Sequence, residues 1–417
     1  MKKRNFILLI SGRIITNIGD SLYAVASMWL VYELTKSNFF TGLAGFLTAA
    51  PIALQFFIGP IIDRIEHRSI LIYSQMIQAV LLAVIPVAYY FDALSAWIVL
   101  VVCPLTSMIQ QFVYPTHFSI LPKIVDKESL TKANSIMTST YQLLDLILMG
   151  VSGIIIAIMG AVAVYMLDAV AFLIAMTLFY YLKFPGNRDS NEKHVGKFSF
   201  KEEWKDYKFN LKEGYAFIRK TFIPKFLLAA IIANFVIGGV SAILPDYAAN
   251  RGGSHIYGWY LGAMSGGLLI GSLMANVFNK IPLGKITIVG FFISGLSWIF
   301  SGLSNITLLS ILLFGVSYIS IGLTNVLFLS SLQSILPSDV LGRVFSFVAG
   351  ATMIAAPLGS LIGGSIATFT GSFAVFMSGS LGILFVSLYW IIIPKLRTLP
   401  SPANFGEDGT LMAKQSG

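Results

Sequence analysis

Five polar side chains stand within long apolar stretches of this sequence, where a buried ionisable group most often serves a function. Arg13, Asn17 and Asp20 are spaced four and three residues apart, so a helix would present them on one face. Asp145 and Asp168 stand singly in two later apolar stretches. Charged groups in hydrocarbon mark ion and substrate pathways, so these five residues are candidates for proton coupling or for lining a substrate cavity.

The protonation state expected of each acid follows from its distance to a buried base. On an ideal helix Asp20 lies about 10 Å along the axis from Arg13, so a direct bond would require an extended Arg13 side chain or a bridging water. Asp20 is expected to stay ionised with the help of Arg13, whereas Asp145, farther in sequence from a buried base, is the expected proton carrier. The alternative for these residues is structural, a set of polar contacts between helices, and for Asp168 a structural pairing is the preferred interpretation.

The composition determines the class of protein that must position these side chains. The chain has 417 residues, of which 56% are hydrophobic and 11% charged, against about 25% charged in a soluble domain. This composition predicts an all-α, multi-pass membrane protein. Twelve apolar runs are long enough to span a bilayer as tilted helices; they cover residues 6–34, 41–62, 69–91, 96–121, 131–159, 162–183, 223–249, 256–280, 286–303, 307–336, 344–369 and 373–394.

The basic residues predict the orientation of these helices. With the N-terminus in the cytoplasm, the loops on that side carry all but three of the 28 lysines and arginines. Lys36 and Arg251 are on the other side, and Arg13 is inside a run. This asymmetry fits the positive-inside rule, with both termini cytoplasmic in a cell membrane, and it explains the basic pI without nucleic acid.

The twelve runs fall into two groups of six, which predicts four parts of the chain. Residues 1–183 are expected to form an N-terminal six-helix bundle and residues 223–394 a C-terminal one. Residues 184–222 are polar, with an apolar stripe at helical spacing, and are expected to form a linker with an amphipathic helix on the inner membrane surface. A regulatory or partner-binding role is the alternative for this linker. Residues 395–417 are expected to be a cytoplasmic tail.

A charged motif joins the second and third runs. Its glycine, aspartate and two arginines are Gly59, Asp63, Arg64 and Arg68. This pattern resembles the loop between the second and third helices of the major facilitator superfamily of secondary transporters, although Glu66 stands where the family pattern has a glycine. The resemblance implies two six-helix bundles that give alternating access to a central site.

The same motif suggests a cytoplasmic gate. The eleventh helix is expected to begin near residues 341–344, where its unpaired N–H groups and positive dipole end would attract an anion. Asp63 is hypothesised to rest against this helix start and against Arg343 when the inner side is closed. Solubilising the loop is the alternative role for Asp63.

Four further segments narrow the resemblance to one branch of the superfamily. Residues 13–37, 115–122, 167–172 and 333–343, in this order, are similar to the exporter branch that contains macrolide-efflux pumps and enterobactin-type siderophore exporters. The resemblance implies export driven by the proton gradient. The chain departs from many drug antiporters because residues 106–114 contain no arginine, so the usual proton-relay assignments do not transfer.

The expected function is therefore secondary active export of an amphiphilic small molecule, drug-like or siderophore-like, by proton antiport. An importer or a lipid-linked flippase of the same fold is the alternative, and a membrane enzyme or receptor is disfavoured. None of the four histidines is expected deep in a helix or shows metal-ligand spacing, and no phosphate-binding loop occurs. The expected partners are a small-molecule substrate, protons and the bilayer, without a cofactor or nucleic acid, and the protein is expected to be a monomer.

Overall fold

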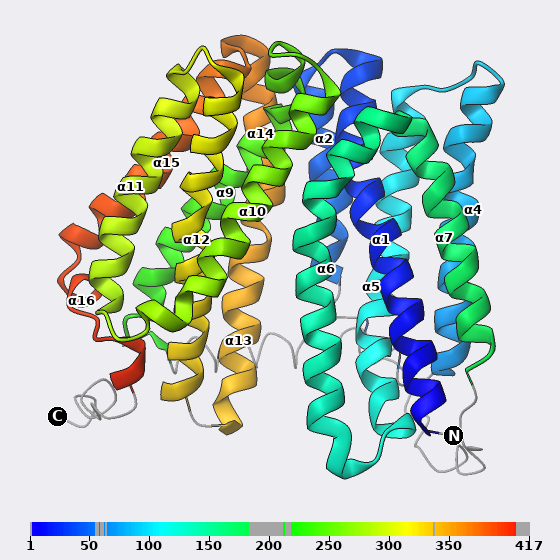
Figure 1. Ribbon diagram of the computed structural model, residues 1–417, viewed down its shortest axis with the longest axis horizontal. Coiled ribbons are helices and arrows are strands. Elements are labelled where there is room, and N and C mark those ends of the chain that lie inside the picture. The colour runs from blue at the N-terminus through cyan, green and yellow to red at the C-terminus, as the bar shows by residue number, and fades with distance from the viewer. Residues whose placement is uncertain are drawn as a thin grey trace. The chain divides into compact units, whose positions relative to one another are not determined.

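The computed structural model describes residues 2–54, 65–182, 221–336 and 338–405, with five isolated positions between these ranges. Within them the chain is helical and forms no strand (Figure 1). The chain divides into two compact units. Unit 1 comprises Met1–Lys36 and Leu47–Lys205, and unit 2 comprises Ser37–Phe46 and Asp206–Gly417.

In the described residues, unit 1 contains five long helices and the short 3-10 helices η1 and η2 (Lys127–Ser129). The start of α1 and the α5–α6 turn lie at one end of the unit, whereas the α4–α5 and α6–α7 turns lie at the other (Figure 1). Gly160, at φ +81°, forms the tight turn between α6 and α7, a conformation that favours glycine. The elements are α1 (Lys2–Thr35), η1 (Ala50–Leu54), α4 (His67–Tyr90), α5 (Ala96–Ile124), α6 (Leu130–Met159) and α7 (Ala161–Tyr180).

Unit 2 contains the remaining long helices and an aromatic core. Trp298, Phe314, Tyr318 and Phe376 are all nearly or fully buried and contact one another ring to ring. The elements are α9 (Ile223–Ala249), α10 (Ser254–Phe278), α11 (Leu283–Leu303), α12 (Thr307–Ile335), α13 (Ser338–Met353), α14 (Ala355–Thr370), α15 (Ser372–Ile392) and α16 (Pro394–Arg397).

Each of the twelve apolar runs predicted from the sequence holds a helix in the part of the chain that the structure describes. Ten helices there are long and apolar enough to cross a membrane. The second run forms the shorter α2 (Asn38–Ala49), which continues into η1, and the fifth forms the 30-residue α6. The prediction of an all-α, multi-pass membrane protein is therefore confirmed.

The first part of α2 packs within unit 2, although it follows α1 directly in the chain. The side-chain amide of Asn38 donates a hydrogen bond to the Asp246 carboxylate of α9 at 3.0 Å. The hydroxyl of Ser360, on α14, donates to the carbonyl of Gly42 at 3.2 Å. A Cβ at Gly42 would lie 2.4 Å from the Ser360 carbonyl oxygen, so the two backbones approach as closely as glycine allows.

Several predicted features fall outside the described residues. They are the linker helix, the last part of the tail and the motif residues Gly59, Asp63 and Arg64. The eleventh helix begins as α13 at Ser338, earlier than the expected start at residues 341–344. In the first part of the expected tail, Leu396 and Leu399 are buried, and the Leu283 N–H donates to the Pro400 carbonyl.

Candidate functional site

A buried ion pair lies on α1. The Arg13 guanidinium reaches the Asp20 carboxylate at 3.2 Å, and the exposed fractions of the two residues are only 4% and 7%. Arg13 also donates to the side chains of Asn17, at 2.5 Å, and Thr16, at 3.3 Å. Arg13 is therefore extended along its own helix and spans the two turns that separate it from Asp20. The predicted common face of Arg13, Asn17 and Asp20 becomes one hydrogen-bonded network.

Two side chains from other helices complete this network. The Arg13 guanidinium carbon lies 3.5 Å from the centre of the Tyr141 ring of α6, a cation–π contact. The Tyr141 hydroxyl is 2.9 Å from Nδ1 of His117 on α5. The expectation that no histidine lies deep in a helix is wrong for His117, which is fully buried and within α5. The signal available in the sequence was the position of His117 within the apolar run 96–121.

Asp168, on α7, has the opposite environment. It is fully buried, and neither carboxyl oxygen forms a hydrogen bond with a described residue. A Cβ at Gly12 would touch the Phe179 ring, and one at Gly19 would touch the Phe172 ring, so α1 and α7 pack in antiparallel register. This register places Asp168 at the level of Tyr23, within one turn of Asp20 on α1. An unpaired carboxylate is costly to bury, so the environment favours the neutral acid.

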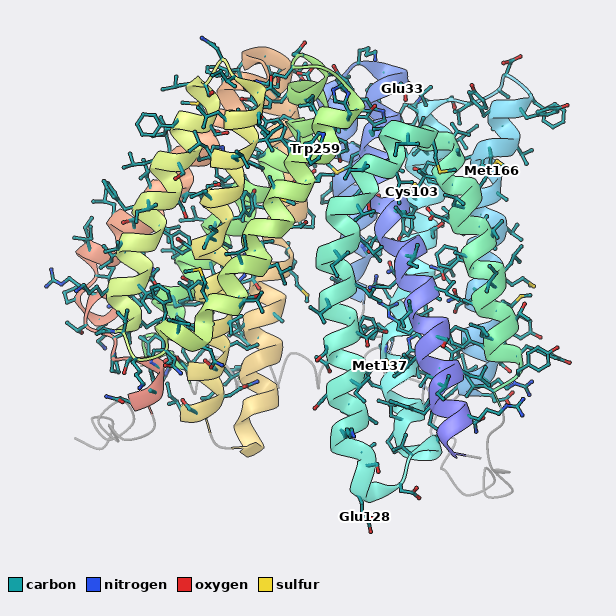
Figure 2. The ribbon with its side chains drawn as sticks, viewed as in Figure 1. Glu33, Cys103, Glu128, Met137, Met166 and Trp259 are labelled. Atoms are coloured by element: carbon teal, nitrogen blue, oxygen red, sulfur yellow. The ribbon has the colours of Figure 1, made fainter. Side chains whose placement is uncertain are left out.

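Two further polar contacts involve α5 in the same unit. Tyr23 donates to the side-chain oxygen of Gln110 at 3.2 Å, and the Cys103 sulfur lies 3.6 Å from the Tyr165 hydroxyl. Figure 2 shows Cys103 between the two ends of unit 1, which Glu33 and Glu128 mark. Polar side chains thus line the interior of unit 1 from His117 to Cys103, in contacts that hydropathy along the chain does not reveal.

The other predicted site residues are placed as follows. Asp145 is in α6, one turn after Tyr141, and its side chain lies outside the described part of the chain. The same is true of the side chain of Arg343 in α13. Arg68 donates to the Tyr180 carbonyl at 2.5 Å and lies 5.3 Å from the centre of that ring, so it joins the start of α4 to the end of α7.

These features define a polytopic helical membrane protein whose first unit encloses buried charges, which in membrane proteins commonly mark ion and substrate pathways. Residues 9–351 match the family model of the Major Facilitator Superfamily, and the chain belongs to this family. Its members and structural neighbours are transporters rather than enzymes.

Two relatives that align with almost the whole chain are efflux proteins. It is 22% identical to the multidrug efflux pump Tap of Mycolicibacterium fortuitum over 410 residues, 95% of this chain and 98% of that protein. It is 24% identical to macrolide efflux protein A of Streptococcus pyogenes over 406 residues, 95% of this chain and 98% of that protein.

Solved structures show the same fold at low identity. The nucleoside transporter NupG superimposes with a TM-score of 0.68 at 10% identity, covering 94% of this chain and 98% of that one. A bacterial homologue of the human lysosomal transporter Spinster superimposes with a TM-score of 0.64 at 13% identity, covering 99% of this chain and 98% of that one.

Proposed function

We propose that this protein exports an amphiphilic small molecule across the cell membrane by alternating access, in exchange for protons. Two efflux proteins, a multidrug pump and a macrolide efflux protein, align with almost its whole length. The observation that carries the proton coupling is the pairing, in one unit, of a buried ion pair with a buried unpaired carboxyl. Macrolide-like compounds are the proposed substrate class. Both termini of the protein are proposed to lie on the cytoplasmic side.

The two kinds of buried acid suit two roles. Asp20 has a guanidinium beside it and can stay ionised in a low-dielectric interior. Asp168 has no hydrogen-bond partner among the described residues and is most stable as the neutral acid. When a rearrangement brings water or a cationic group to such an acid, the proton can leave. A change of charge linked to a change of access is what proton-driven export requires.

Asp145 and Asp168 are the proposed proton carriers. Asp145 is proposed because of its position in the sequence, one turn after Tyr141, whose ring stacks on Arg13. Asp168 is supported by its burial and lack of partners. Asp20 is proposed to shape the substrate site together with Arg13 and Asn17. The gate hypothesis for Asp63 and Arg343 is retained as part of the proposal.

Inverted membrane vesicles with an acidic interior test this assignment, with radiolabelled erythromycin as the probe. Neutralising the proton carrier, by Asp145→Asn or Asp168→Asn, should abolish accumulation against a gradient because no charge change remains to couple. Exchange of labelled for unlabelled drug without a gradient should persist, since binding and alternating access are retained.

Glu128→Gln removes an exposed carboxylate from the turn before α6 and is the matched control. It should accumulate the drug like the unaltered protein. If Asp145→Asn and Asp168→Asn both still concentrate erythromycin, neither acid carries the proton. If the unaltered protein is insensitive to the imposed pH gradient, the proposal of proton antiport is wrong.

A further inference from the structure

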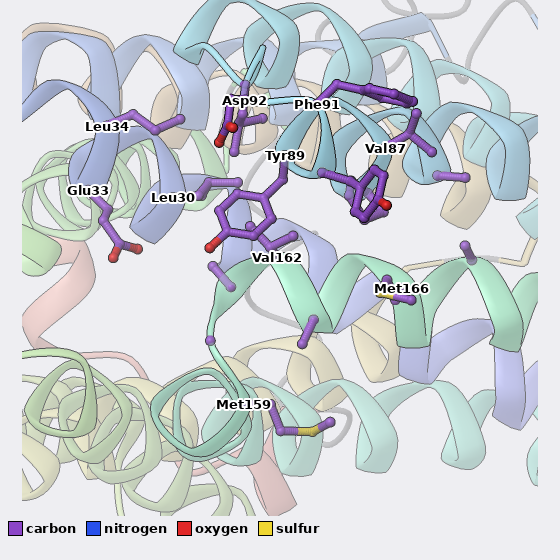
Figure 3. A pocket seen from close by; sticks show the side chains of 18 of the residues that line it. Leu30, Glu33, Leu34, Val87, Tyr89, Phe91, Asp92, Met159, Val162 and Met166 are labelled. Carbon is purple, nitrogen blue, oxygen red and sulfur yellow. The ribbon is translucent and has the colours of Figure 1, made fainter.

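A separate cavity of about 990 Å³ opens on unit 1, at the end of the unit opposite the start of α1. It lies between the last turns of α1 and α4 and the first turns of α7 (Figure 3). None of the buried residues of the Arg13 network lines it. The cavity is therefore a second site, distinct from the candidate transport site.

The wall of this cavity is mainly apolar and deformable. Leu30 and Ala169 form buried parts of it, whereas Met159 and Met166 are about half exposed. Methionine side chains are flexible and polarizable, so they adapt to ligands of different shape. A drug-sized apolar body would fit both the volume and the lining.

The polar groups of the cavity are acidic and aromatic. Glu33 closes one side, and Asp92 stands in the turn after α4 (Figure 3). The hydroxyl end of Tyr89 extends into the space on the side of Glu33 (Figure 3). No lysine, arginine or histidine is among the described residues that line the cavity. Neither carboxylate forms a salt bridge with a described residue, and the nearby Lys36 ammonium lies instead over the Tyr32 ring at 5.1 Å.

Aromatic rings strengthen the preference for positive charge. Tyr89, Tyr90 and Phe91 occupy three consecutive positions at the rim, with 60%, 81% and 71% of their surface exposed. The face of an aromatic ring attracts a cation, and organic ammonium ions are bound in this way. Two carboxylates beside these rings would repel the phosphate of an anionic lipid, so charge complementarity favours a cationic occupant over a phospholipid.

We propose that this cavity, formed by α1, α4 and α7 and bearing Glu33, Asp92 and Tyr89, binds amphiphilic organic cations. The apolar body would occupy the space between Leu30, Val162 and Met166, with the charge toward the two carboxylates. Binding requires only unit 1. A role for the cavity as an exit or holding site in the outer leaflet rests on the proposed export function and its orientation.

A pair of isosteric ions of opposite charge tests the proposal. Val162, labelled in Figure 3, lines the cavity on the first turn of α7. The variant Val162→Cys is made in the full-length chain with Cys103→Ser, so that it carries a single thiol. Tetraphenylphosphonium should slow alkylation of this thiol by a maleimide in lipid nanodiscs. Tetraphenylborate, of the same shape but negative, should leave the alkylation rate unchanged.

Glu33→Gln with Asp92→Asn in the same background should raise the phosphonium concentration needed for protection by about tenfold. This tenfold change corresponds to about 1.4 kcal/mol, or about 0.7 kcal/mol for each of the two exposed charges. Glu128→Gln, the same charge change at the opposite end of unit 1, should leave protection intact. Ala163→Cys provides a second reporter in case Val162→Cys does not fold.

Equal protection by tetraphenylphosphonium and tetraphenylborate would overturn the proposal and make the cavity an apolar site for lipid chains. Protection that survives the double neutral variant would also overturn it. Erythromycin accumulation by the same variants is measured separately. Loss of phosphonium protection with intact accumulation would support the cavity as a cation site outside the transport route. Failure of accumulation in the unaltered protein would instead refute the export proposal alone.

Discussion

Arg13 joins polar and aromatic side chains of two helices in the interior of unit 1. It binds Asp20 and Asn17 on its own helix and stacks on the Tyr141 ring of another helix. One guanidinium, planar and permanently charged, can make these contacts together, whereas lysine has no planar face for the stack. The residue therefore links helix α1 to α6 and sets the charge of the cluster.

Removing one partner of the Arg13–Asp20 ion pair should lower the stability of the protein more than removing both. Arg13→Gln leaves the Asp20 carboxylate buried without its cation, a defect that typically costs about 3–5 kcal/mol. Asp20→Asn leaves the guanidinium without its anion and should cost a similar amount. The double variant Arg13→Gln/Asp20→Asn leaves no unpaired buried charge, so it should recover much of the lost stability.

Thermal unfolding of the purified variants in detergent measures these differences. The single variants should unfold at clearly lower temperatures than the double variant, and neither the single nor the double variants should export drug. Single variants as stable as the unaltered protein would show that the pair is water-accessible and weak. A double variant less stable than either single variant would show that the amides cannot replace the ions.

At the scale of elements, one helix pair of unit 2, α10 and α12, packs backbone against backbone. On α10, a Cβ at Gly271 would lie 1.9 Å from the Ile319 carbonyl oxygen of α12. On the facing helix, a Cβ at Gly322 would lie 2.2 Å from the Leu268 carbonyl oxygen. Small residues allow membrane helices to approach closely and gain dispersion energy, since lipid provides little hydrophobic driving force between helices.

Gly271→Ala should therefore separate α10 from α12. The methyl group meets rigid backbone, and overpacking of this kind costs about 1–3 kcal/mol. Gly266, on the same helix, has open space around a Cβ, so Gly266→Ala is the matched control and should be neutral or slightly stabilising. Unfolding temperatures of the two variants in one detergent make the comparison. Equal stability of the two would indicate that the helices shift apart at no cost.

At the scale of the whole molecule, α2 belongs to both units. Its first part, through Phe46, packs in unit 2, and its last part belongs to unit 1, where the Ser107 hydroxyl donates to the Thr48 carbonyl. Alternating access moves one half of such a transporter relative to the other. Because the chain on both sides of this first part of α2 belongs to unit 1, we predict that the contacts of Asn38 with Asp246, and of Gly42 with Ser360, break in each cycle.

A thiol cross-link between α2 and α9 should stop transport. Asn38→Cys and Asp246→Cys replace side chains that are hydrogen bonded at 3.0 Å, and Cys103→Ser removes the native thiol. A short bifunctional methanethiosulfonate should abolish erythromycin accumulation, and dithiothreitol should restore it. The single-cysteine variants, treated alike, are the control. Full transport by the cross-linked protein would show that these contacts persist through the cycle.

The order of apolar runs and charges in the sequence determined the class of fold. Bilayer thickness sets the length of a spanning helix, and the cost of unpaired backbone groups in hydrocarbon makes such runs helical. Arg13, Asn17 and Asp20 could be assigned to one face because helical spacing is a local property. Asp145 and Asp168 could be singled out because an acid within an apolar run is conspicuous.

Only the tertiary structure decided which polar groups meet. The ring of Tyr141, the buried His117 and the lack of a hydrogen-bond partner for Asp168 depend on how α5, α6 and α7 pack on α1. The same holds for α2, which packs with unit 2, and for the acidic cavity at the end of unit 1. Hydropathy reports whether a residue enters the membrane, whereas side-chain contacts between helices depend on rotation and register, which runs of apolar residues leave undetermined.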